Sequence, residues 1–541
     1  MKILKETDRR NLIWYSAAAF ILAVFRAGSV KFYESAYVSL PGRIEAVFLI
    51  VRIFLYLVLF LGIFALLDRV LHSKRTWEIL FKDGEEKNGK PWTPYLVLAG
   101  GWLLPLLIKY PAAVCYDTLA MLEQYRAGQV SEHHSVYYTV LMGRLVKIGE
   151  HFGNANCGMF AFSALHYIVL VAALGWSVNI LRKMNVRRSV RRLVLLIYLL
   201  NPYISGYVGV AIKDQPYAAF IALFFACLAE LYLDHEAFAK KPQKLAVMFL
   251  SVVNIWLIRK NGSYILIAIA VLFVIRSFRK RLSKRPALVL IAALVVSAVL
   301  YSALGTVYHA DKGSIKEALS LPFQQTARYV KYHGDEVTEE EREVINAVLP
   351  CDRLAEAYNP RISDPVKGMY QGDNSKLIPY FKVWFAQFLK HPLTYVSATW
   401  EQNYYLFMPE VDNIKLYYDI ELGPFNGRFD ALDGLFDRVD RLVAPKEWIV
   451  REFELLHRIP LVRYLGNLSF WLYVLIIVTV LSLVFRLDDF ILLALSWFTV
   501  VFVILGPVIQ GHPRYMFPAV YVMPATVLFM LGRMRDKQKN S

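Results

Sequence analysis

Acidic, basic and histidine side chains occur where long apolar runs end, and such side chains can do chemistry. Asp117 lies in the stretch YPAAVCYDTLAMLEQYRAG, directly after an apolar run, and His133 and His134 lie in SEHHSVYY, before the next one. A carboxylate in this position can take a proton from a hydroxyl group, but Asp is also favoured as the capping residue of a helix. The residues of this segment leave both interpretations of Asp117 open.

Further charged side chains stand at corresponding places along the chain. They are Lys213 and Asp214 in VAIKDQPYA, Arg259 and Lys260 in WLIRKNGSY, and His512 and Arg514 in GHPRYMFP. Charge near a bilayer is costly and tends to face a cavity or a partner. Each Lys or Arg can also extend to the interface and anchor its own helix, and Asp214 can pair with Lys213. A common site requires that all of these groups lie on one side of a membrane.

The elements that must position these residues are long apolar segments. The 541 residues are 57% hydrophobic with a mean hydropathy of +0.40, and apolar residues form blocks such as EAVFLIVRIFLYLVLFLGIFALL at 45–67. Runs of roughly 20 apolar residues cross a bilayer as helices. We therefore predict an all-α polytopic membrane protein with about twelve transmembrane helices. The predicted spans are 12–28, 45–67, 93–109, 157–181, 192–211, 216–233, 245–258, 263–276, 286–306, 467–485, 489–508 and 516–532.

The basic residues predict the orientation of the chain in the membrane. The net charge is +17, but most Lys and Arg residues form short clusters between apolar runs, which is a topology signal and not a nucleic-acid signal. Because basic loops stay in the cytoplasm, both termini are predicted inside and the segments with Asp117, Lys213, Arg259 and Arg514 outside. The four cysteines show neither metal-ligand spacing nor an evident disulfide pattern.

Two outward segments are predicted to carry further helices. In the outer loop 110–156, one short amphipathic helix begins at Asp117 and ends near Gly128, and a second runs from Ser135 to His151. The longest loop is predicted to be mainly helical and contains a capping box between Thr338 and Glu341. The chain then divides into an N-terminal transmembrane module, an extracytoplasmic loop domain and C-terminal transmembrane helices, with bounds 1–308, 309–466 and 467–541.

An ordered series of motifs resembles a known superfamily. The series is YPAAVCYDTL, SEHHSVYYTVL, VAIKDQPYA, WLIRKNGSY, LPFQQTARYV, YNPRISDPVK and HPRYMFP. The first two motifs resemble the first catalytic loop of GT-C glycosyltransferases, and the series as a whole resembles the bacterial DUF6020 branch. The resemblance implies a GT-C-like fold in a bacterial plasma membrane. It also implies an inverting transferase that moves a sugar from a polyprenyl phosphate to a hydroxyl of a glycan, lipid or protein outside the cell.

The resemblance also implies roles for individual residues. Asp117 would be the catalytic base, while Arg259 and Arg514 would hold the donor phosphate, whose departure needs positive charge nearby. Lys213 would support them, and Asp214 would orient the acceptor or a cation. The whole substrate-binding set is His133, His134, Lys213, Asp214, Arg259, Lys260, His512 and Arg514.

Neither a cofactor nor a metal is expected. Some GT-C enzymes use a paired acid that can hold a divalent cation, but Cys115 stands where the second acid would be, which favours a metal-independent mechanism. A cation held by Asp117 with His133 and His134 stays open. The alternatives are a lipid-linked sugar flippase or transporter, and a polymerase or ligase of surface glycans. A transporter should place charges near the bilayer midplane and show related halves, and we find no internal repeat.

Overall fold

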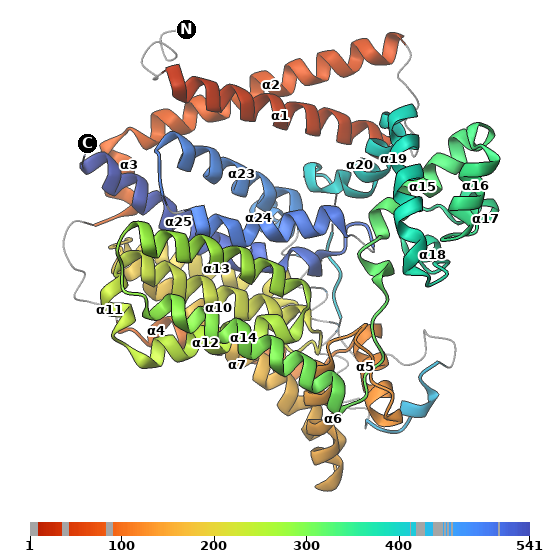
Figure 1. Cartoon of the computed structure of the whole chain (residues 1–541). Coiled ribbons are helices and arrows are strands. Elements are labelled where there is room, and N and C mark those ends of the chain that lie inside the picture. Colours follow the sequence, from red (N-terminus) through yellow and green to blue (C-terminus); the bar gives the residue numbers. More distant parts are fainter. Residues whose placement is uncertain are drawn as a thin grey trace. The chain divides into compact units, whose positions relative to one another are not determined.

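Helices are the regular secondary structure of this protein. The computed structural model describes residues 9–34, 43–82, 90–411, 413–417, 428–436, 447, 451, 454–455, 458–488, 490–506 and 509–540. Within these residues every regular element is a helix, and β-type pairing is limited to isolated bridges (Figure 1). The prediction of an all-α fold is confirmed.

The described residues contain seven helices that are long and apolar enough to cross a membrane. These are α1 (Arg9–Glu34), α2 (Arg43–Leu71), α7 (Ala155–Lys183), α10 (Asp214–Leu233), α13 (Asn261–Arg279), α14 (Arg285–Val307) and α25 (Phe517–Lys539). Four shorter apolar helices accompany them: α4 (Thr93–Ile108), α12 (Pro242–Ile258), α23 (Leu468–Val484) and α24 (Phe490–Leu505). The predicted span 192–211 corresponds to α8 (Arg188–Leu200) and the short α9 (Pro202–Ser205), so the count of twelve stays a prediction.

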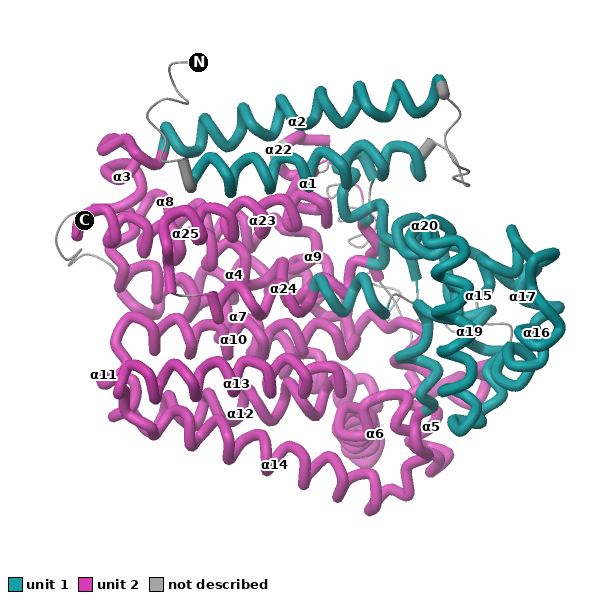
Figure 2. Tube along the Cα trace, turned by 45° about the horizontal axis from the view of Figure 1, so that its top comes forward, with its two compact units in different colours: residues 1–70, 314–413, 500–512 teal, residues 71–313, 414–499, 513–541 magenta. Residues whose placement is uncertain are grey.

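The chain forms two compact units, which Figure 2 shows in two colours. Unit 1 consists of Met1–Val70, Ser314–Asn413 and Val500–His512, and unit 2 of Leu71–Gly313, Ile414–Thr499 and Pro513–Ser541. Each unit is thus assembled from three separate segments. The predicted division at 309 and 467 follows the membrane topology, and it stays a prediction.

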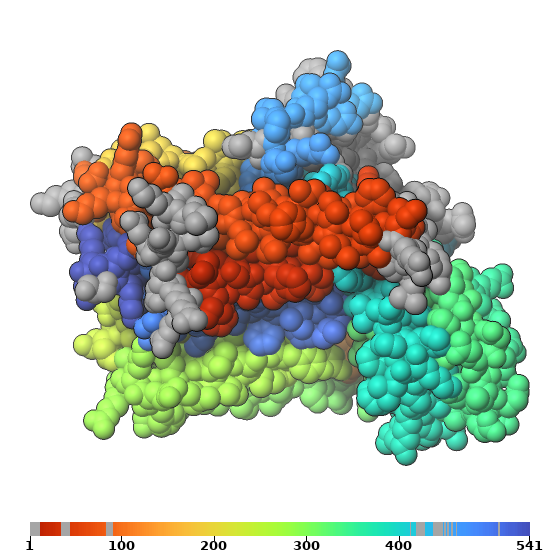
Figure 3. All heavy atoms as spheres, turned by 90° about the horizontal axis from the view of Figure 1, so that it is seen from above, coloured from red at the N-terminus to blue at the C-terminus, as the bar shows by residue number. Residues whose placement is uncertain are grey.

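Unit 1 contains a helical hairpin with an apolar exterior. Helices α1 and α2 pack through the stacked rings of Tyr15 and Phe64, 5.3 Å apart, and the Tyr15 hydroxyl donates to Asp68 Oδ1 at 2.8 Å. Apolar side chains such as Phe48 and Phe54 of α2 are nonetheless exposed, and the atoms of α2 form an orange band in Figure 3. A helix with so much exposed apolar surface is suited to contact lipid.

The rest of unit 1 is a small helical domain with its own core. Its helices are α15 (Ser320–His333), α16 (Glu339–Asn346), α17 (Cys351–Ala357), α18 (Asp364–Lys367), α19 (Leu377–Lys390) and α20 (Pro392–Asn403). Buried aromatic and aliphatic side chains, among them Phe323, Tyr329 and Tyr380, form one cluster. The capping box at the start of α16 is confirmed, because Thr338 Oγ1 accepts from the Glu341 N–H and the Glu341 carboxylate accepts from the Thr338 N–H.

Unit 2 is a bundle built around α10. The sequence of α10 is uncharged and mainly apolar between Asp214 and Glu230, and nearly all of its side chains are buried. It packs against α7, α12 and α25, and α7 also contacts α4. Short helices complete the unit: α3 (Lys74–Leu80), α11 (His235–Ala239) and α22 (Pro460–Leu465).

Two helices of unit 2 correspond to the predicted outer loop. Helix α5 (Tyr116–Ala127) ends at Gly128 in the left-handed conformation (φ 69°), and α6 (Val136–His151) begins after Ser135, whose hydroxyl accepts from the Tyr138 N–H. Both predicted helices are therefore present. The first helix begins one residue before the predicted start at Asp117. The alternative that Asp117 caps this helix, which the sequence left open, is wrong, because Cys115 is the N-cap residue and Asp117 is the second residue inside α5.

Helices α6 and α7 approach so closely that only glycine fits between them. A Cβ at Gly158 would lie 2.2 Å from the carbonyl oxygen of Leu145 and 2.8 Å from Cα of Val146. These neighbours are backbone atoms, which cannot rotate away. The contact fixes the second outer helix on the bundle.

We expect Gly158→Ala to destabilise the protein by about 1–3 kcal/mol, because the new methyl group overlaps the backbone of α6. Thermal unfolding of the purified protein in detergent would measure the change. The matched control is Gly62→Ala in α2, where a Cβ meets nothing within 4 Å. An equal unfolding temperature for both variants would contradict the packing.

Candidate functional site

The predicted site residues of unit 2 stand at helix ends that lie together. Asp117 follows the C-terminus of α4, Asp214 begins α10, Arg259 lies between α12 and α13, and Arg514 directly precedes α25. Because α10 packs against both α12 and α25, the N-terminus of α10 brings these segments to one end of the bundle. Each of these helices therefore contributes an end, and not its middle, to the site.

Asp117 and Arg514 form the central ion pair. Arg514 Nη1 donates to Asp117 Oδ2 at 2.9 Å, across 397 positions of sequence. The two side chains are 11% and 22% exposed, so the pair is shielded yet still reachable from solvent. The carboxylate also stands in the first turn of α5, where the helix dipole favours negative charge. A charge partner, and not a cap, thus accounts for Asp117.

The remaining charges surround this pair. Lys213 Nζ lies 3.2 Å from Nδ1 of the buried His134, and the Arg259 guanidinium makes an ion pair with the fully buried Asp214. The interpretation that Lys213 and Arg259 only extend to an interface does not account for these partners. Asp214 at the start of α10 pairs with Arg259 after α12. Its role is therefore not limited to neutralising its neighbour Lys213.

Tyrosine rings hold the two guanidinium groups. The Arg259 Cζ lies 5.9 Å from the centre of the Tyr515 ring, and the Arg514 Cζ lies 5.3 Å from the same ring. Tyr217 of α10 supports Arg259 from another direction at 5.7 Å. Such contacts orient a cation without neutralising it. The rings therefore orient the two guanidinium groups beside their carboxylate partners, Asp117 and Asp214.

Backbone contacts fix the loops that carry these side chains. Ala113 and Val210 form an isolated parallel bridge, in which the Ala113 N–H donates to Gly209 O at 2.9 Å and the Ala211 N–H to Ala113 O at 2.8 Å. The Thr118 hydroxyl, next to Asp117, donates to the Ala211 carbonyl. The loop before α5 and the loop before α10 are thereby joined.

A second contact joins α6 to the segment of Arg259. The Ser135 hydroxyl, beside His134, donates to Leu257 O at 2.6 Å, and the Tyr137 hydroxyl donates to Asn254 Oδ1 at 3.0 Å. Ser135 accepts a hydrogen bond as the cap of α6 at the same time. His134 and Arg259 are therefore held on a common framework.

The local charges shift the pKa values of the site. Burial alone would raise the pKa of Asp117, but Arg514, Lys213, His134 and Arg259 together lower it well below its usual value. Burial and the nearby Lys213 lower the pKa of His134 to about 3. Burial also lowers the pKa of Lys213, and Asp117 opposes that shift. At neutral pH Asp117 is ionised and His134 is neutral.

The other predicted residues have different surroundings. His133 is exposed, and its ring packs edge-on with the His134 ring, with centroids 4.7 Å apart. Lys260 is exposed at the start of α13. His512 is buried in unit 1 and so belongs to the other compact unit. The structure therefore brings together Asp117, His134, Lys213, Asp214, Arg259 and Arg514.

Sequence reasoning missed the aromatic part of the site. Tyr217 and Tyr515 stand within the motifs KDQPY and HPRYMFP, yet their ring contacts with arginine join residues far apart in the chain. The buried Lys109, which donates to Val208 O at 2.9 Å beside the same loops, was also missed. Lys109 stands at the end of an apolar run in the sequence, and this position could have indicated that it belongs with the other charged residues at span ends.

Comparison with models of known protein families assigns the chain to one family. The model of the family of unknown function DUF6020 matches residues 95–541, which is most of the chain and includes every residue of the site. The chain belongs to the DUF6020 family. The predicted resemblance to that family is thereby confirmed.

Comparisons with individual proteins add little about this DUF6020 chain. No curated protein matches it. A crystal structure of ArnT from Cupriavidus metallidurans bound to undecaprenyl phosphate matches it at 10% identity, covering 82% of this chain and 78% of that one, with a TM-score of 0.29. A similarity at this level supports no conclusion about the fold or activity of the DUF6020 chain.

We expect Asp117→Asn and Arg514→Gln to be energetically coupled. A double-mutant cycle on thermal or denaturant unfolding should give an interaction energy of about 1–3 kcal/mol, because each single change leaves a shielded partner without its counter-charge. The control cycle is Arg126→Gln with Glu150→Gln, a closer but more exposed pair at 2.6 Å with 41% and 34% exposure. Its coupling should stay below about 1 kcal/mol. Strict additivity at Asp117 and Arg514 would contradict the pairing.

The contribution of Asp117 to stability should depend on pH in one direction. Since folding lowers its pKa, the contribution is complete above the unfolded value of about 4 and is lost as the pH falls toward the folded value. The difference in unfolding free energy between wild type and Asp117→Asn should be constant from about pH 7 to 5 and then shrink by up to about 1.4 kcal/mol per pH unit. A difference that grows on acidification would contradict this assignment.

Proposed function

We propose that this chain is an inverting glycosyltransferase that moves a sugar from a polyprenyl phosphate to an acceptor hydroxyl at the outer face of the membrane. One observation supports the proposal most: the carboxylate of Asp117 is surrounded by Arg514, Lys213 and Arg259 at the end of a bundle of apolar helices. A sugar joined to a lipid phosphate needs this combination, namely a proton acceptor, an excess of cations and adjacent apolar surface.

The reaction has a simple balance of atoms and charge. The oxygen of the acceptor hydroxyl attacks the anomeric carbon while the bond from that carbon to the phosphate oxygen breaks. Asp117 takes the hydroxyl proton, and the polyprenyl phosphate leaves as an anion held by cations. Attack opposite the leaving group inverts the anomeric configuration. The step uses only these two substrates and needs no cofactor.

The resting ion pair explains how the base would be activated. With its low pKa, Asp117 is a weak base while Arg514 holds it. A donor phosphate adds negative charge beside Arg514, Arg259 and Lys213, so it competes for the cations that lower that pKa. Donor binding would then raise the basicity of Asp117 when the acceptor hydroxyl arrives.

The remaining residues have supporting roles in this proposal. Arg259 and Arg514 hold the phosphate, and the shared Tyr515 ring sets their spacing. Asp214 keeps the Arg259 guanidinium in place, and the neutral His134 orients Lys213. His133 and Lys260 are exposed nearby in sequence and would contact the outer parts of donor or acceptor.

The charges of α10 favour an enzyme over a flippase or transporter. Helix α10 carries Asp214 at its first residue and Glu230 in its last turn, with only uncharged residues between them. A transport path would place polar groups near the middle of such helices. A polymerase or ligase of surface glycans would share the chemistry of a transferase, so the acceptor must distinguish them.

We expect Asp117→Asn to lower sugar transfer by about a hundredfold or more, because the acceptor hydroxyl loses its base. Membranes containing each variant would be supplied with radiolabelled polyprenyl-phosphate sugars, and labelled products would be quantified. Glu123→Gln is the matched control, since Glu123 lies in the same helix α5. The control should transfer at the wild-type rate.

The same assay distinguishes the proposed role of Asp117 as the base from that of Arg514 in binding the donor phosphate. Arg514→Gln should weaken use of the donor, seen as a higher donor KM, in addition to any loss of rate. Near-normal transfer by Asp117→Asn, at equal amounts of inserted protein, would remove Asp117 as the base. Donor dependence unchanged in Arg514→Gln would remove Arg514 from the phosphate site.

A further inference from the structure

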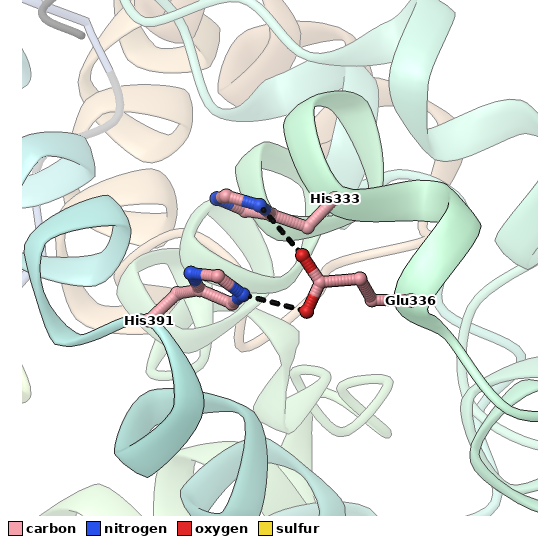
Figure 4. Close-up of side chains that lie close together, drawn as sticks. All are labelled: His333, Glu336 and His391. Carbon is pink, nitrogen blue, oxygen red and sulfur yellow. Dashed lines mark hydrogen bonds and ion pairs between the residues drawn. The ribbon is translucent and has the colours of Figure 1, made fainter. Parts of the chain in front are cut away.

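A second cluster of chemically competent side chains lies in unit 1. His333 is the last residue of α15, Glu336 stands in the turn that follows, and His391 lies at the junction of α19 and α20 (Figure 4). One ligand atom from each residue lies within 4.8 Å of the others. The chain therefore returns after more than fifty residues to bring a second imidazole to the same carboxylate.

Both imidazoles present a nitrogen to Glu336. His391 Nε2 lies 2.7 Å from Glu336 Oε2, and His333 Nδ1 lies 3.5 Å from Glu336 Oε1. The two rings are stacked, with centroids 3.7 Å apart and planes at 14° (Figure 4). Tyr329, one turn before His333, covers both rings at 5.4 and 5.7 Å. The three groups therefore form a small, partly enclosed site.

The outer nitrogen of His333 has a partner of its own. Nε2 lies 2.9 Å from Thr394 Oγ1. In the tautomer in which Nε2–H donates to this hydroxyl, Nδ1 turns its lone pair toward the Glu336 carboxylate. The Nδ1 lone pair and the Glu336 carboxylate, both electron-rich, then repel each other. A cation bound between them would be attracted to both. A hydrogen bond on the outer nitrogen is also the usual support of a metal-bound histidine.

The protonation states suit a metal. Burial and the neighbouring His391 lower the pKa of His333, and Glu336 only partly opposes this shift. The hydrogen bond from His391 lowers the pKa of Glu336. At neutral pH the cluster thus offers an ionised carboxylate and a neutral imidazole, the forms that bind a metal.

We propose that His333, Glu336 and His391 bind a divalent transition-metal ion such as Zn²⁺, with water completing its coordination. Two imidazoles and one carboxylate are ligands that Zn²⁺ takes readily, and ligand atoms around a tetrahedral ion lie about 3.4 Å apart. The separation of 3.5 Å between His333 and Glu336 already fits this value. Metal binding would move the proton of His391 from Nε2 to Nδ1, and small rotations of the part-exposed rings would then let the Nε2 lone pair converge on the same point.

The metal would fasten three segments of the small domain. His333 ends α15, and His391 joins α19 to α20, so one ion would close a long loop of chain. Nearby, Lys390 Nζ already contacts Glu341 Oε1 at 2.9 Å, which ties α19 to α16. Closing a long loop stabilises the folded state by restricting the unfolded chain. This site is separate from Asp117 and does not depend on the proposed transfer reaction.

The test is metal binding by the purified full-length chain, in detergent and without a histidine tag. After treatment with a chelator, Co²⁺ is titrated while its visible absorption is followed, and Zn²⁺ is then added as competitor. We expect one equivalent of Co²⁺ to bind and Zn²⁺ to displace it. Zn²⁺ should also raise the unfolding temperature, as any ligand of the folded state does.

Variants locate the ion. His391→Ala and Glu336→Gln should abolish the Co²⁺ spectrum, and Thr394→Val should weaken binding by about 10–100-fold through loss of the outer support. His151→Ala, which removes a histidine in α6 of unit 2, should bind as wild type does. The Glu336 side chain is 47% exposed, so its variant should fold even if His391→Ala does not.

Two results would overturn the proposal. The first is a wild-type chain that binds no stoichiometric Co²⁺ or Zn²⁺, which would make the cluster a proton-bridged contact. The second is binding that Glu336→Gln and His391→Ala leave unchanged, which would place the ion elsewhere. Neither readout involves sugar transfer, so failure here is distinct from failure of the proposed function.

Discussion

The ion pair of Asp117 and Arg514 is the constraint on which the rest of the site depends. A carboxylate and a guanidinium that are this shielded are stable only while each has the other or an equivalent charge. Lys213 and Arg259 add positive charge around the same carboxylate, so the site carries more cation than its own acids neutralise. That surplus suits an anionic ligand, and it makes the resting state of Asp117 a weak base.

The fold supplies what this electrostatic arrangement needs. The Ala113–Val210 bridge joins the loops before α5 and α10, and Ser135 ties the start of α6 to the end of α12. Apolar helices with charges only at their ends leave the bundle interior to packing, as in α10. Rigid connections between loops matter because a displacement of about 1 Å can separate a base from its substrate. The contacts at Ala113 and Ser135 thereby hold together the loops that carry the proposed chemistry.

The sequence was sufficient for features that depend on local pattern. The apolar run of α2, the glycine end of α5 at Gly128 and the capping box of Thr338 follow from neighbouring residues and agree with the structure. The partner of Asp117 could not be predicted in this way, because Arg514 lies 397 positions away. The capping interpretation of Asp117 was wrong for the same reason. Capping preference is local, and here a distant charge accounts for the carboxylate. Likewise, His333 and His391 meet only through the packing of α15 against α20.

We propose above all that the cations around Asp117 in unit 2 bind the phosphate of a polyprenyl phosphate. The most direct measurement compares binding of a short-chain polyprenyl phosphate and the matching uncharged polyprenol to the purified protein. The account predicts at least about tenfold tighter binding of the phosphate, or about 1.4 kcal/mol, and loss of that preference in Arg259→Gln and Arg514→Gln. Equal affinity for both lipids, or a preference that survives both changes, would contradict it.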